Sequence, residues 1–69
     1  MSKQFAVGDY SWKTVSEVID MVNANCDSAN EERIPMKIIH EDLGWFIECF
    51  NESDEDRLDK HLKYIYGIE

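Results

Sequence analysis

Two cysteines and two histidines are the side chains of this 69-residue chain that could act as nucleophiles, as acid–base groups near neutral pH, or as soft metal ligands. Cys26, Cys49, His40 and His61 stand at none of the spacings typical of a zinc site, and the cysteines form no CxxC pair. The sequence also contains no G-x-S-x-G, P-loop, G-x-G-x-x-G or H-E-x-x-H motif. We therefore predict a protein that is not an enzyme, holds no metal or cofactor, and keeps both thiols reduced.

Carboxylates are the most abundant charged groups, with fifteen Asp and Glu against seven Lys and Arg and a formal net charge of −8. This balance disfavours direct binding to nucleic acids and anionic membranes, because both depend on basic patches. The acids gather at three junctions between expected elements, and they form one negative patch if these junctions project from one end of the fold. With two aromatic residues they make our predicted partner-binding surface: Asp27, Glu31, Glu32, Glu41, Asp42, Trp45, Glu52, Asp54, Glu55, Asp56, Asp59 and Tyr66.

Residues 36–50 hold most of the large apolar side chains around the break at residues 41–44. Their β-branched and aromatic types favour a β-hairpin, in which Gly44 closes a type I turn with a bulge. This turn pairs Glu41 with Trp45, so that Ile39, Ile47, Trp45 and Cys49 share one face. The alternative is a helix, because apolar residues also recur at helical spacing, although Gly44 inside a helix costs about 1 kcal/mol relative to alanine.

Helices are predicted on both sides of this stretch. Ser11 or Thr14 can serve as the N-cap of a helix over about residues 12–25, and Thr14 with Glu17 fits a capping box. Ser53 is the expected N-cap of a C-terminal helix, and Gly67 is expected to end it. The buried stripe of that helix is predicted to consist of Leu58, Leu62 and Ile65, with His61 at its boundary and His40 exposed near the hairpin tip.

Two shorter segments complete the expected architecture. Residues 4–8 predict either a short edge strand beside the hairpin or a loose arm, and residues 26–32 predict an acidic surface loop. Residues 1–69 therefore form a single small α+β domain, with the helices on one face of a short antiparallel sheet. The alternative, if residues 36–50 are helical, is an all-α bundle of three helices.

The absence of an apolar run of membrane-spanning length and of a signal-peptide core predicts a cytoplasmic protein. In its short length, acidity and lack of catalytic motifs, the chain resembles bacteriophage-encoded inhibitors of host factors, nuclease immunity proteins and antitoxins. We predict an acidic protein-binding module that inhibits or blocks a basic or nucleic-acid-handling protein, with carboxylates mimicking nucleic-acid phosphates. The alternative is a homo-oligomeric structural or assembly component, such as a dimer formed through a second apolar face of the hairpin.

Overall fold

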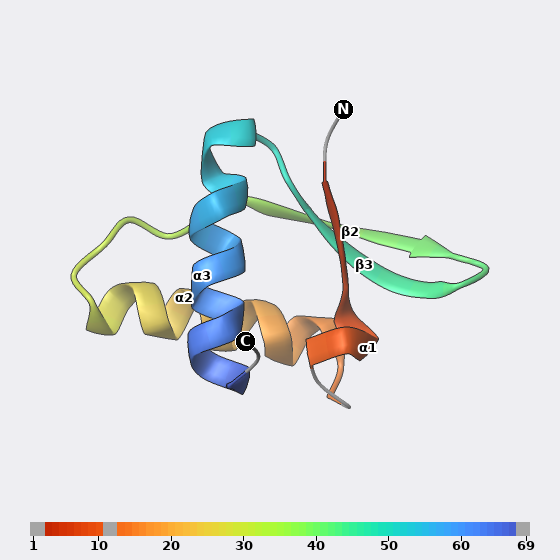
Figure 1. Ribbon diagram of the computed structural model, residues 1–69, viewed down its shortest axis with the longest axis horizontal. Coiled ribbons are helices and arrows are strands. Elements are labelled where there is room, and N and C mark those ends of the chain that lie inside the picture. Colours follow the sequence, from red (N-terminus) through yellow and green to blue (C-terminus); the bar gives the residue numbers. More distant parts are fainter. Residues whose placement is uncertain (1–2, 11–12, 68–69) are drawn as a thin grey trace.

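A β-hairpin, and not a helix, occupies the central apolar stretch in the computed structural model, which describes residues 3–10 and 13–67. The α+β class is thereby confirmed, and the three-helix bundle is wrong. Figure 1 shows the hairpin crossing the molecule and extending beyond the helices. The elements run β1 (Gln4–Ala6), α1 (Val7–Tyr10), α2 (Val15–Ser28), β2 (Met36–Glu41), β3 (Gly44–Cys49), a 3-10 turn (Glu52–Asp54) and α3 (Glu55–Tyr66).

The sheet has the strand order β1-β3-β2, with both pairs antiparallel. Residues 4–6 are therefore an edge strand, one of the two expected alternatives, and a single helical turn follows it. The predicted hairpin register is wrong by one residue, because Glu41 pairs with Gly44 around a two-residue loop. Gly44 does have a positive φ of 123°, as expected, but it lies within the ladder.

Cross-strand chemistry explains this register. Ile38 pairs with Ile47, and Lys37 pairs with Glu48, whose carboxylate lies 3.5 Å from the lysine Nζ. The predicted register instead set Ile38 opposite Glu48, which matches an apolar side chain with a charge. A slip of one residue moves every side chain of a strand to the other face. Ile39 was predicted to share the face of Ile47, but Ile38 shares that face instead.

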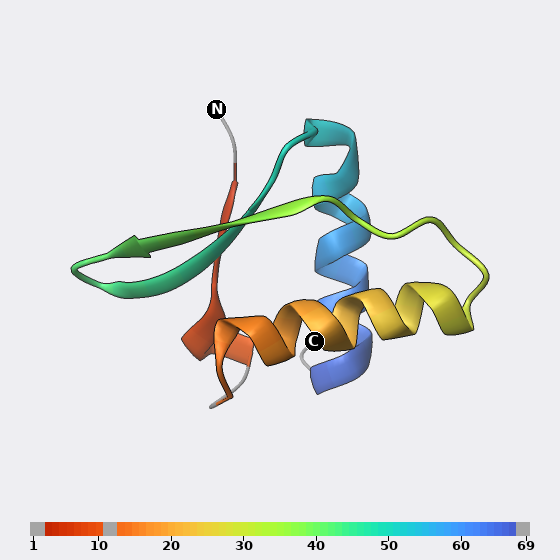
Figure 2. The same cartoon turned by 180° about the vertical axis from the view of Figure 1, so that it is seen from behind.

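The core lies between one face of the sheet and the two long helices, as expected (Figure 2). Its sheet side is formed by Phe5, Ile47 and Cys49. Its helix side comes from stripes at a spacing of four residues, which bring side chains to one face of each helix. The stripes are Val18, Val22 and Cys26 in α2, and Leu58 and Leu62 in α3, all of them 0% exposed.

The helix boundaries differ from the predicted ones. The Thr14 hydroxyl accepts a hydrogen bond from the Glu17 N–H at 3.3 Å, so this N-cap is confirmed, whereas Ser11 and Trp12 lie outside the described residues. α2 continues to Ser28, because Cys26 extends the buried stripe by one further turn. The predicted loop over residues 26–32 is therefore wrong for its first three residues.

The start of α3 was also mispredicted. Ser53 lies inside the 3-10 turn, and α3 begins at Glu55 with no side-chain capping bond at its N-cap. Gly67 ends the helix in the left-handed conformation, with φ 67° and ψ 28°, as predicted. That conformation suits glycine because it has no Cβ to clash with the backbone.

Candidate functional site

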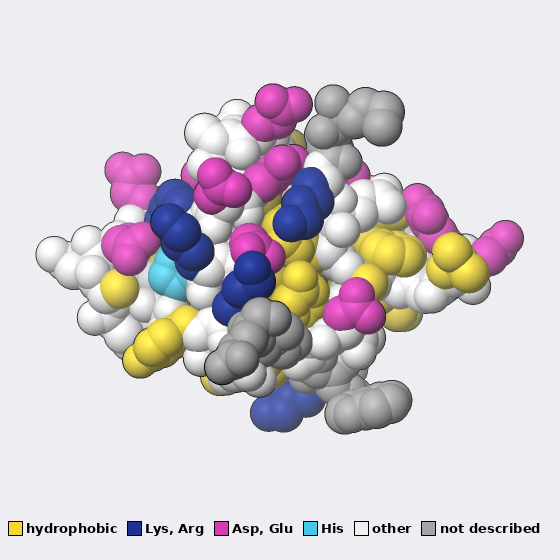
Figure 3. Space-filling view, in the orientation of Figure 1, with side chains coloured by type: hydrophobic (Ala, Val, Ile, Leu, Met, Phe, Trp, Pro, Cys, Tyr) yellow, Lys and Arg dark blue, Asp and Glu magenta, His cyan; other side chains and the backbone are white. Residues whose placement is uncertain are grey.

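The predicted acidic surface is divided between separate parts of the molecule, whose longest dimension is 36 Å. Glu41 and Asp42 lie at the hairpin tip, at the right-hand end in Figure 1, while residues 29–35 curve around the opposite end. The 3-10 turn and the first turn of α3 lie next to that segment, because Arg57 contacts both Glu31 and Asp54, and they are distant from the hairpin tip. Figure 3 accordingly shows acidic side chains in separate groups. The three junctions do not form one continuous patch.

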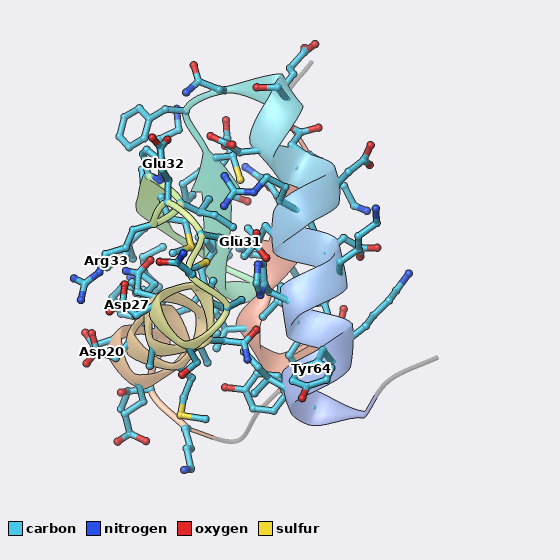
Figure 4. All side chains as sticks on the ribbon, turned by 90° about the vertical axis from the view of Figure 1, so that its left-hand side faces the viewer. Asp20, Asp27, Glu31, Glu32, Arg33 and Tyr64 are labelled. Carbon is cyan, nitrogen blue, oxygen red and sulfur yellow. The ribbon has the colours of Figure 1, made fainter. Side chains whose placement is uncertain are left out.

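Arg33 neutralises the first acid of this set. Its Nε and Nη2 atoms donate to the two carboxylate oxygens of Asp27 at 3.1 and 2.6 Å. These hydrogen bonds hold the pKa of the Asp27 carboxyl below its usual value. Figure 4 shows the two side chains together on the outer side of α2. Glu32, the neighbour of Arg33, is exposed.

Arg57 neutralises two further acids. Its Nη1 donates to Asp54 Oδ1 at 3.2 Å, while its Nη2 reaches Glu31 Oε1 at 3.5 Å and the carbonyl oxygen of Glu32 at 2.6 Å. One guanidinium therefore fastens the segment after α2 to the start of α3. Bidentate and multiple contacts of this kind suit arginine, whose donors form a fixed planar fork.

The remaining predicted residues of this region are partly engaged as well. Glu55 Oε2 accepts the backbone N–H of Lys3 at 2.8 Å, and Asp59 lies 2.8 Å from Lys63 Nζ. Tyr66 packs against the core. The side chains of Glu52 and Asp56 are exposed to solvent.

A polar cluster, which we define as Asn25, Cys26, Glu31, Arg57 and His61, lies between α2 and α3. Cys26 and His61 are buried, Asn25 and Arg57 are half-buried, and Glu31 is exposed. His61 is buried, with only 8% of its surface exposed, so its predicted place at the boundary of the buried stripe of α3 is wrong. Its Nδ1 lies 2.5 Å from Asn25 Oδ1, and its Nε2 lies 3.6 Å from the Cys26 sulfur and 3.5 Å from Glu31 Oε1. A groove of about 700 Å³ opens beside this cluster.

A thiol, an imidazole and an amide in contact are the groups that thiol hydrolases use for nucleophilic catalysis. Here the nucleophile is out of reach, because Cys26 is 0% exposed. Burial also raises the pKa of its thiol, which keeps the sulfur protonated and weakly nucleophilic. Within residues 3–10 and 13–67, no group of three or more His, Cys, Asp or Glu side chains is arranged to hold a metal ion. The cluster therefore joins two helices.

The hairpin arm, which we define as residues 38–45, has the opposite character. Leu43 is 90% exposed, and Ile38 and Trp45 are each 47% exposed, although all three are large apolar side chains. The Trp45 ring stacks on His40 with 4.0 Å between centroids and 11° between planes, and His40 is exposed, as predicted. This stacking holds the indole in place at the surface.

A groove of about 530 Å³ runs beside the arm. Leu43 and Trp45 line it from the arm, and Val7 and Val15 line it from α1 and α2. Glu41 and Asp42 stand next to it, both exposed; Glu41 accepts a hydrogen bond from the Gln4 side chain at 3.4 Å. Of the predicted partner-binding residues, three thus come together on the arm: Glu41, Asp42 and Trp45. Leu43 was missed, and its place in an exposed turn was the available signal.

Comparisons of the chain with protein-family models, with curated proteins and with solved structures found no match. None of the described helices has both the length and the apolar character that crossing a membrane requires.

Proposed function

We propose that this protein is an acidic protein-binding module that blocks a basic partner, and that the hairpin arm is its recognition element. One observation carries the proposal: Ile38, Leu43 and Trp45 are exposed on a projecting arm whose tip bears Glu41 and Asp42. Exposed apolar side chains that cluster and are bordered by charge are typical of protein-binding surfaces. The proposed activity is binding, without catalysis.

The two kinds of residue on the arm have different roles in this proposal. Trp45 and Leu43 supply the affinity, because aromatic and aliphatic anchors that become fully buried carry most of the energy of an interface. Glu41 and Asp42 steer the encounter and select a partner whose apolar depression is bordered by Lys or Arg. A nucleic-acid-handling protein fits that description, because its own site must be basic.

The acids at the other end of the molecule contribute less to this binding. Asp27, Glu31 and Asp54 already face arginines within the chain, so a partner would have to break these contacts to use them. Two buried free thiols, Cys26 and Cys49, support the reducing cytoplasm as the compartment in which the module acts.

An affinity capture from a cytoplasmic lysate tests the proposal with a matched pair of variants. The arm variant is Leu43→Ser with Trp45→Ser, and the control is Tyr64→Ser, which removes a ring that is 79% exposed on α3. We expect the wild-type chain and the control to retain one stoichiometric partner that the arm variant loses. Capture that survives in the arm variant, or that the control abolishes equally, contradicts the proposal.

The charge component needs a separate pair. Asp42→Lys changes an exposed acid on the arm, and Asp56→Lys changes an exposed acid on α3. We expect Asp42→Lys to slow association with the captured partner by about tenfold at low salt, and Asp56→Lys to have little effect. The difference should shrink at high salt, where exposed charges are screened. Equal effects of both variants would show that the arm has no special electrostatic role.

A further inference from the structure

The outer edge of β2 is an open strand edge. The sheet formed by the described residues has β1 at one edge and β2 at the other. β1 has three residues and turns directly into α1, whereas β2 has six residues and contains no proline or glycine. Figure 2 shows β2 running across the molecule in front of β3, with its other side open. Unpaired N–H and C=O groups on such an edge favour pairing with another strand.

The charges of β2 are complementary to those of a second β2. Lys37 and Glu41 lie four residues apart on the same face of the sheet, and both are exposed. When two copies pair antiparallel with Ile39 opposite Ile39, Lys37 of each copy lies opposite Glu41 of the other. A two-fold axis through this pair makes both ion pairs equivalent, as a closed dimer requires.

Neighbouring registers lack this match. Along a strand, the backbone N–H and C=O groups of successive residues point alternately to the neighbouring strand on one side and on the other. The registers that allow pairing therefore differ by steps of two residues. One such step in one direction sets Lys37 opposite Ile39, and two steps set it opposite Lys37 of the second copy. A step in the other direction sets Lys37 opposite Leu43 and leaves Glu41 opposite Ile39. The charges therefore select one register.

The same register improves the surroundings of the exposed residues. Lys37 already lies 3.5 Å from Glu48 on β3, and the second copy adds a carboxylate on its other side. Ile38, which is 47% exposed, comes to lie beside His40 of the second copy. In each copy, Trp45 on β3 stacks on that His40 ring. Cross-strand apolar and opposite-charge neighbours stabilise an antiparallel pair. The dimer also extends a three-stranded sheet to six strands.

We propose that this protein forms a two-fold symmetric dimer by antiparallel pairing of β2 with β2 of a second copy, centred on Ile39, with Lys37 facing Glu41 across the interface. The dimer does not rest on the partner proposed above. It pairs the outer edge of β2, including Ile38 and Glu41 of the hairpin arm, while the groove beside Leu43 and Trp45 stays open. For a domain of this size, association adds stability by mass action.

Sedimentation over a concentration series tests the dimer and its register together. We expect the wild-type chain to be a dimer at high concentration. Lys37→Glu and Glu41→Lys each place like charges opposite one another twice, so each should weaken the dimer by about tenfold. Combining both substitutions restores opposite charges across the interface, so the double variant should dimerise more tightly than either single variant, although the glutamate introduced at position 37 still faces Glu48 within the chain. Circular dichroism of all four chains confirms that each is folded.

Three results overturn the proposal. The first is a wild-type chain that stays monomeric across the series. The second is a dimer that both single variants leave unchanged, and the third is a double variant that stays as weak as the single ones. The arm variant, Leu43→Ser with Trp45→Ser, separates this test from that of the proposed function, because it should still dimerise while losing the captured partner.

Discussion

The two ends of this molecule use the same residue types in opposite ways. At the polar cluster, Cys26 and His61 are buried, and Arg57 and Glu31 face each other within the chain. On the hairpin arm, His40 is exposed and Leu43 is 90% exposed. The cluster thus satisfies its polar groups internally and holds α2 against α3, whereas the arm leaves apolar surface in water. The charged groups of the cluster therefore stabilise the fold, whereas the large apolar side chains of the arm remain exposed to solvent.

The largest difference in stability should come from replacing leucine by alanine in the core and on the arm. Leu58→Ala removes a side chain that is 0% exposed in the core, and should lower the free energy of unfolding by about 2–5 kcal/mol. Leu43→Ala removes one from the arm and should change it by no more than about 0.5 kcal/mol. Urea unfolding followed by circular dichroism measures both. A large loss at Leu43 would show that the arm packs against the fold in solution.

Replacing the two histidines by alanine should also cost more stability at the cluster than on the arm, but the difference should be smaller than for the leucines. His61→Ala leaves Asn25 without its partner in the cluster and should cost about 1–3 kcal/mol. His40→Ala removes only the stacking on Trp45 and should cost about 0.5–1.5 kcal/mol at most. The same unfolding experiment at neutral pH measures both. Equal losses would remove the distinction between a structural and a surface histidine.

A further effect concerns the thiol of Cys49 in alkaline solution. Burial raises the pKa of this thiol from its ordinary 9.0 to about 11, with Asp54 and Glu55 adding to the shift. Since the folded state holds the proton more tightly, this stability is fully present below pH 9 and is lost as the pH rises towards 11. Cys49→Ala should show a shallower decline over that window, as followed by circular dichroism in urea. Identical slopes would refute the buried neutral thiol.

The sequence predicted the elements better than their ends. The turn formers at residues 41–44 placed the hairpin, and Thr14 and Gly67 marked the start of α2 and the end of α3. The register was missed because the loop could be closed with two residues or three, and local turn chemistry did not decide between them. The pairing of Lys37 with Glu48 favours the two-residue loop. These two residues are far apart in sequence, and only the strand ladder brings them together.

The candidate site shows the same division. The exposure of Glu41, Asp42 and Trp45 could be predicted from sequence because they lie at a turn that any hairpin must expose. Asp27, Glu31 and Asp54 were assigned to a partner because nothing local shows that Arg33 and Arg57 would reach them. The contact between Glu31 and Arg57 spans 26 positions of sequence, so only the docking of α3 against the end of α2 creates it.

By itself, the sequence determined the acidic net charge, the hairpin, two amphipathic helices and their glycine and threonine boundary residues, because each depends on neighbours within a few positions. The tertiary structure decided which charges remain available and which polar groups are buried. Those outcomes depend on the distances between elements. These distances are set only when the apolar stripes of α2 and α3 pack against Ile47 and Phe5. The acids were visible from the start, but their partners appeared only with the fold.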